Sequence, residues 1–288
     1  MTRAPVVARA AFALVAAVVT VATASCGAPL MKRMALPAGP GTSVVPADAA
    51  YQALLDAASA CRRMRTITAE VGVAGTVGGR RAPSGHLIVA VRALPLSARI
   101  EALAPFGPVF IFSAHATDSM LLLVRDNRLL EHGPPAAVLE ALTGVPLDPA
   151  ELRTMITGCS PAPGLGAVAA DTTQARQLGD DWMTMPEGTG AIYLHRANRT
   201  APWQIAVAVR RDASGAEWHA EYRDFEQDLA RSIHLWSSDP GRFDLGLSLS
   251  QVEINVTLDE GAFSMRIPRA ATPITLEELR DAGPSDGR

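Results

Sequence analysis

The chain has 288 residues, of which 48% are hydrophobic and 19% are charged. This length and composition are enough for a sizeable hydrophobic core and exclude a mostly disordered protein. The formal net charge of −3 at pH 7 argues against nucleic acid as the main partner.

The first 25 residues have the order of a bacterial export signal. Arg3 and Arg9 precede the apolar run 10–21, and small residues lead up to Cys26. The apolar run is shorter than the ~20 residues that a membrane-spanning helix needs. Cys26 after Ala-Ser resembles the lipobox of bacterial lipoproteins, in which the signal is removed and the cysteine is acylated. We therefore expect residues 1–25 to be a lipoprotein signal peptide and Cys26 to carry the lipid; an ordinary signal-peptidase site is the alternative, because Thr23 stands where the lipobox usually has leucine.

Residues 26–46 are rich in proline and glycine, which predicts a lipidated cysteine followed by a flexible tether, with one domain over 47–284. Loss of the signal removes two arginines and leaves 29 acidic against 24 basic residues, a net charge of −5. Cys61 and Cys159 then remain as an even pair in an oxidising compartment. They form either a disulfide or two buried free thiols.

The hydrophobic pattern predicts a mainly β (α+β) fold. An amphipathic helix over 47–63 is followed by apolar alternation with a period of two, and helical patterns return at 134–142 and at 148–157, where Asp148 is a suitable N-cap. We expect roughly eleven antiparallel strands, at 66–77, 86–92, 98–103, 109–114, 119–124, 127–132, 190–198, 203–211, 217–225, 231–238 and within 250–268, where 251–258 alternates strictly. Such strands can curl into a barrel with an apolar interior, which the helical pair 134–157 would plug or cover.

The sequence contains no recognisable catalytic or metal-binding pattern. There is no GxSxG, HExxH, Walker or dinucleotide-binding motif. The histidines are scattered without ligand spacing, and we expect them to be solvated or locally hydrogen-bonded: His86, His115, His132, His195, His219 and His234. We therefore predict no enzyme activity, no cofactor and no metal.

Three segments together carry a resemblance to a known family. The segments "ARIEALAPFGPVFIFSA", "MLLLVRDNRLLE" and "LTGVPLDPAELRTMITG" resemble LolB, an outer-membrane lipoprotein that receives lipoproteins from the periplasmic carrier LolA. The resemblance covers about residues 65–160 and is best in the last segment. It implies a half-open antiparallel β-barrel of about eleven strands around an apolar cavity with a helical lid.

The resemblance also gives a role to Pro105, Phe106 and Gly107. LolB has a protruding loop with an exposed leucine that delivers lipoproteins into the membrane, and Phe106 falls at that place. No polar side chain occurs from Ala102 to Phe112, which suits a loop that meets lipid. The alternative is that Phe106 folds back over the core.

Alternation places thirteen apolar side chains on the face that would line the cavity, although all of them also suit an ordinary core. They are Ile67, Val71, Val73, Leu87, Val89, Ile100, Phe110, Phe112, Leu121, Leu123, Val252, Ile254 and Val256. The expected ligands are lipoprotein acyl chains or other lipids.

The resemblance implies an outer-membrane, lipid-anchored protein that faces the periplasm, accepts lipoproteins from a LolA-like carrier and inserts them into the membrane. We expect a monomer. The alternative is a lipid-sensing regulatory protein similar to RseB, which would need a partner-binding second domain within residues 161–284.

Overall fold

The computed structural model describes residues 31–39, 41, 43–82, 85–145, 147–158, 170–211 and 215–283. The predicted signal peptide, Cys26 and Cys159 lie outside these residues. The chain from Met31 onward forms one compact unit, which contains every helix and strand described below.

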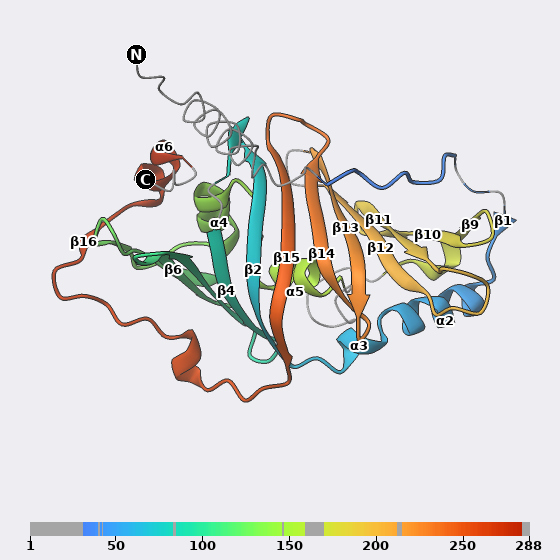
Figure 1. Ribbon diagram of the computed structural model, residues 1–288, viewed down its shortest axis with the longest axis horizontal. Coiled ribbons are helices and arrows are strands. Elements are labelled where there is room, and N and C mark those ends of the chain that lie inside the picture. Colours follow the sequence, from blue (N-terminus) through green and yellow to red (C-terminus); the bar gives the residue numbers. More distant parts are fainter. Residues whose placement is uncertain are drawn as a thin grey trace, which may run out of the picture. The chain divides into compact units, whose positions relative to one another are not determined.

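One large, almost entirely antiparallel sheet dominates this unit (Figure 1). Its strand order is β1-β9-β10-β11-β12-β13-β14-β15-β2-β4-β5-β6-β7-β8-β16, with β3 paired to β2. The two sequence halves join where β15 pairs antiparallel with β2. Since the order runs from β1 to β16 without a pairing between them among the described residues, the sheet stays open, as expected for a half-open barrel.

The strands have the following bounds: β1 (Ser43–Val44), β2 (Thr66–Val77), β3 (Arg80–Arg81), β4 (Gly85–Arg92), β5 (Ser97–Ala104), β6 (Gly107–His115), β7 (Asp118–Leu123), β8 (Arg128–Leu130), β9 (Arg176–Leu178), β10 (Trp182–Glu187), β11 (Gly190–His195), β12 (Gln204–Arg211), β13 (Glu217–Glu226), β14 (Leu229–Ser237), β15 (Phe243–Ile254) and β16 (Thr272–Pro273). The helices are α2 (Ala47–Ala57), α3 (Ser59–Arg62), α4 (Pro135–Thr143), α5 (Pro149–Thr157) and α6 (Leu276–Ala282), with 3-10 turns η2 (Thr172–Gln174) and η3 (Glu260–Phe263).

The helices predicted from the sequence are present. The first is divided into α2 and α3, and α4 and α5 match the predicted pair. Asp148 caps α5 with a full capping box, in which its side chain accepts from Glu151 N and the Glu151 side chain accepts from Asp148 N. Apolar side chains of α4 and α5 belong to the same buried core as the inner face of the sheet, among them Val138, Leu142 and Leu152.

The eleven predicted strands correspond to β2, β4–β8 and β11–β15, and five strands were missed. Four of these, β1, β3, β9 and β16, have only two or three residues, too few for a periodic pattern. The fifth, β10, carries Pro186, and proline is depleted in strands.

The predicted alternating strand 251–258 is only partly present, because residues 251–254 belong to β15 and residues 255–258 lie beyond its end. β15 begins earlier, at Phe243, and ends at Ile254. Its pairing with β2 shifts between Ser250 and Glu253, and Gln251 and Asn255 have positive φ angles of 49° and 59°. This irregularity ends the alternation, so the regular apolar face of β15 is formed instead by Phe243, Leu245, Leu247 and Leu249.

Two extended segments cover parts of the outer face of the sheet. Residues 256–271 include the buried Phe263, whose carbonyl accepts a hydrogen bond from Ser113 Oγ of β6. Residues 31–36, which we call the strap, contact β12–β15. The prediction of a flexible tether is therefore wrong for the strap, because polar and apolar side chains of "MKRMAL" find partners on the sheet.

Candidate functional site

The inner face of the sheet is apolar over nearly its whole width. Eleven of the thirteen predicted lining residues, the ten from Ile67 to Leu123 and Val252, belong to or pack against one buried cluster that also contains residues of α4 and α5. Phe112 and Leu121 have no exposed surface. The structure therefore brings these residues together under the helical pair, and their contact with a ligand remains a prediction.

The other two predicted lining residues, Ile254 and Val256, are not part of this cluster. Val252 packs against the main cluster and is half-buried, but Ile254 is 36% exposed and Val256 lies beyond the end of β15. After the shift at Ser250, Ile254 pairs with the buried Ile67 and so lies on the same face of the sheet, and its contact with a ligand remains a prediction.

One ion pair interrupts the apolar inner face. Arg210, near the end of β12, pairs with the buried carboxylate of Glu187 at the end of β10. Tyr222 lies near both, and burial raises the pKa of its phenol, which stays protonated. Removal of one partner would lower the stability of the fold, since it leaves an uncompensated buried charge.

The β5–β6 hairpin carries the most exposed aromatic side chain among the described residues. Ala104 pairs with Gly107, so Pro105 and Phe106 form a two-residue turn. Phe106 is 98% exposed, which excludes the alternative in which its ring folds over the core. Gly107 has a φ angle of 114°, a conformation that favours glycine and directs the chain back into β6.

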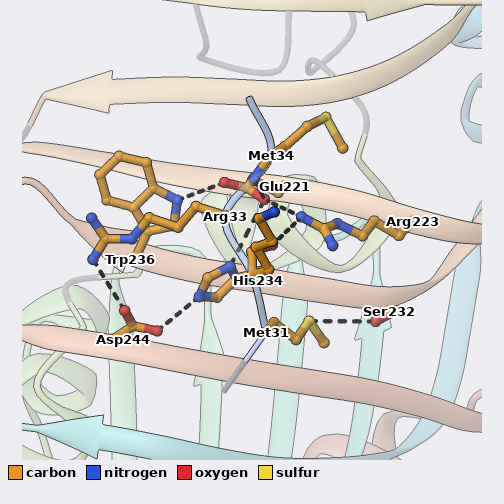
Figure 2. A network of polar contacts seen from close by, with 10 residues as sticks. Met31, Arg33, Met34, Glu221, Arg223, Ser232, His234, Trp236 and Asp244 are labelled. Carbon is orange, nitrogen blue, oxygen red and sulfur yellow. Dashed lines mark hydrogen bonds and ion pairs between the residues drawn. The ribbon is translucent and has the colours of Figure 1, made fainter. Parts of the chain in front are cut away.

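A buried polar network on the outer face was not predicted from the sequence (Figure 2). Glu221 of β13 and His234 of β14 are each 1% exposed. His234 Nε2 lies 2.7 Å from Asp244 Oδ1, and Trp236 Nε1 donates to Glu221 Oε1 over 2.9 Å. Acidic and histidine side chains at alternate positions of otherwise apolar strands were the signal that could have revealed it.

The strap covers this network on the outer face of the sheet. Met34 N donates to Glu221 Oε2 over 2.7 Å, and Arg33 Nη2 pairs with Asp244 Oδ2 over 3.1 Å while its guanidinium lies 4.2 Å from the centre of the Trp236 ring. Figure 2 shows Met31, Arg33 and Met34 side by side over the three strands. Met34 and Leu36 also pack against Val207 and Val209 of β12.

The environment of the network shifts the pKa values of its members. Burial alone would raise the pKa of Glu221, but contacts with His234, Trp236, Met34 N and Arg223 outweigh burial and lower the pKa to about 2. Burial alone would lower the pKa of His234, but Glu221 and Asp244 outweigh burial and raise the pKa. The two carboxylates thus favour the charged form of His234.

The environments of the histidines therefore differ more from one another than the sequence indicated. His234 and His219 are buried, and His219 stacks on Trp236 with 3.8 Å between ring centres. Among the described residues, no cluster of histidine, cysteine, aspartate or glutamate has the composition of a metal site.

Cys61 is buried on α3, is disulfide-bonded, and its Sγ lies 3.7 Å from the carbonyl oxygen of Thr157. Its predicted partner, Cys159, follows Thr157 by two residues in the sequence and lies outside the described residues. Pairing of Cys61 with Cys159 thus remains a prediction, and so does the acylation of Cys26.

No protein-family profile matches the chain. No curated protein is significantly similar to it in sequence.

Solved structures are similar in fold at very low sequence identity. A LolA superfamily protein from Nitrosomonas europaea has a TM-score of 0.53 and 10% identity, covering 75% of this chain and 97% of that chain. A DUF1329 family protein from Desulfovibrio piger has a TM-score of 0.50 and 9% identity, covering 76% of this chain and 97% of that chain. The fold is therefore LolA-like.

Proposed function

We propose that this protein is an outer-membrane lipoprotein of LolB type, which binds acyl chains, accepts lipoproteins from a LolA-like periplasmic carrier and inserts them into the membrane. One observation carries the proposal. The β5–β6 hairpin places Ile100, Phe110 and Phe112 on the apolar inner face and Phe106, 98% exposed, at its tip. A single element thus connects a surface that can cover acyl chains with a side chain that can enter a bilayer.

The energetics of acyl chains in water explain why such a protein needs both features. Each exposed methylene costs ~0.8 kcal/mol, so a chain of ~16 carbons costs on the order of ten kcal/mol. A carrier must therefore keep the chain covered between two membranes. The inner face already lies against α4 and α5, so acyl chains would enter between these helices and the sheet and replace one apolar contact with another.

The proposed location follows from the predicted acylation of Cys26. The anchor would hold the domain on the periplasmic side of the outer membrane, with Phe106 as a second, weaker membrane contact. Among the described residues, no helix has the length and hydropathy needed to cross a bilayer.

Lipid extraction and mass spectrometry of the purified unit 31–288 test ligand binding. We expect co-purified acyl lipids, and displacement of a fluorescent fatty acid by palmitate. Transfer is tested by incubating the acylated protein with a LolA-like carrier that holds a radiolabelled lipoprotein. Label that stays on the carrier, together with no bound lipid, would contradict the proposal.

The RseB-like alternative would need a second domain within residues 161–284. The continuation of one sheet through β9–β15 supports the LolB-type proposal over this alternative.

A further inference from the structure

The strap crosses the outer face of the sheet and is not one of its strands. At one end, Leu36 packs against apolar side chains of β12. At the other end, Met31 lies beside Gly246 of β15, and its Sδ lies 3.7 Å from Ser232 Oγ of β14. Figure 1 shows this segment in blue, on its way from these strands to β1 at the edge of the sheet. The docked strap therefore lets the chain leave the sheet over β14 and β15, far from β1.

The contacts that hold the strap are partly open to solvent. Lys32 O accepts a hydrogen bond from Arg223 Nη2 over 2.5 Å. The side chains of the Arg33–Asp244 pair are 48% and 28% exposed, a setting in which an ion pair stabilises little. Holding a segment in one conformation also costs conformational entropy, which opposes these contacts. The docked strap is therefore held by a small net free energy.

The acids beneath the strap keep partners when the strap is absent. Glu221 Oε1 accepts from Trp236 Nε1 over 2.9 Å, and Glu221 Oε2 accepts from Arg223 Nη2 over 2.8 Å. Asp244 Oδ1 lies 2.7 Å from His234 Nε2. All of these partners belong to β13, β14 and β15. Release of the strap would thus leave neither carboxylate uncompensated, which is the largest cost of breaking a buried charge network.

Two glycines lie between the strap and β1. Gly39 and Gly41 have φ angles of 94° and 86°, a region that favours glycine. A Cβ atom at Gly39 would meet nothing within 4 Å, so the chain has room to change direction there. Hinges are a few such residues that absorb a change in backbone angles, and residues 37–41 therefore suit a hinge.

We infer that the strap is a releasable segment, which docks across β12–β15 in one state and leaves the folded sheet in a second state. Release moves the point at which the chain leaves the sheet from β15 to β1, seven strand positions apart, or about 34 Å along the sheet. The strap then adds its length to the chain that precedes β1. The proposed function gives this reach a use, because a protein that meets both a carrier and a membrane acts over more than one distance. The release itself does not depend on that function.

Lys32 makes the release measurable, because it is the only lysine in the sequence. Endoproteinase Lys-C, which cuts after lysine, therefore has one site in the chain 27–288. It cuts a native protein at a rate that follows the open fraction when opening and closing are fast. We expect cleavage at least about ten-fold slower than in a free peptide of residues 27–42. This ratio should stay constant in urea below the unfolding transition, because local opening exposes little surface.

Three variants separate local release from unfolding, each compared with a free peptide cut under the same conditions. Leu36→Ser removes the apolar contact with β12 and should raise the rate by about ten-fold. Ile267→Ser, at an exposed residue outside the strap, should change it by less than about two-fold. Leu121→Ala, in the core, should lower the melting temperature but leave the rate unchanged. Salt raised from about 50 to about 500 mM should speed cleavage, because it screens the pair of Arg33 with Asp244.

Three results would overturn the releasable strap. Wild type cut as fast as the peptide would show that the strap is not docked. Cleavage that rises with urea and in Leu121→Ala, in step with thermal unfolding, would show that the strap leaves only when the sheet unfolds. An unchanged rate in Leu36→Ser would show that the contact with β12 does not hold it. None of these results bears on the proposed function, whose failure appears separately as absence of bound acyl lipid in the same preparation.

Discussion

His234 Nε2 lies 2.7 Å from Asp244 Oδ1, and this contact links β14 to β15 beneath the strap. Arg33 pairs with the other oxygen of Asp244 over 3.1 Å. One carboxylate therefore joins two strands of the sheet and the strap.

Glu221→Gln should destabilise the protein by on the order of 3 kcal/mol at neutral pH, given a pKa lowered from 4.5 to about 2. Because the folded-state pKa lies below the unfolded one, this stabilisation is present above about pH 4.5 and is lost as pH falls toward 2. Urea unfolding between pH 7 and pH 3 measures it. The control is Glu226→Gln, whose exposed pair with Arg231 should contribute less than about 1 kcal/mol. Equal losses in both variants would show that burial of Glu221 has no energetic role.

His234→Gln should show the opposite pH dependence. The pKa of His234 is raised above 6.5, so its stabilisation is complete below pH 6.5 and is lost as pH rises through the folded-state value. The stability difference between wild type and variant should therefore be largest near pH 6 and smaller at pH 9. His195→Gln, on the tilted contact with Trp182, provides the control. A difference that grows with pH would contradict a charged His234.

Phe106→Glu should leave the free energy of unfolding within ~0.5 kcal/mol of wild type, since Phe106 is 98% exposed and contributes little to the core. Liposome flotation should nevertheless weaken, because the variant loses an apolar transfer term of ~1.5 to 3 kcal/mol and must keep a carboxylate hydrated. Ile267→Glu, at a residue 45% exposed elsewhere, is the control. Unchanged flotation would remove the membrane role of Phe106.

Cys26→Ala should abolish acylation and membrane fractionation. Metabolic labelling of cells with a palmitate analogue, followed by separation of membranes, checks this prediction. Wild-type protein without label would contradict the lipoprotein assignment and leave the ordinary signal-peptidase site as the explanation of the N-terminus.

The native unit 31–288 should show no free thiol when it is denatured in an alkylating reagent. A bridge between Cys61 and Cys159 would close a loop of roughly 100 residues and stabilise the fold by up to ~5 kcal/mol. Mass spectrometry before and after reduction counts the alkylated cysteines. Two alkylated cysteines without reduction would exclude the bridge.

Much of this fold could be predicted from local patterns in the sequence. Alternation identified the longer strands because a sheet with one buried face repeats every two residues, and Asp148 marked the start of α5 because a capping side chain needs only its own helix. The exposed tip at Phe106 was also readable, since Pro105 and Gly107 define a tight turn between two apolar strands.

Tertiary structure decided what depends on contacts between distant segments. The shift after Ser250 arises in the pairing of β15 with β2, and no local sequence pattern indicates it. Arg33, Glu221 and Asp244 lie far apart in sequence, and only the docking of the strap across β13–β15 brings their charges together.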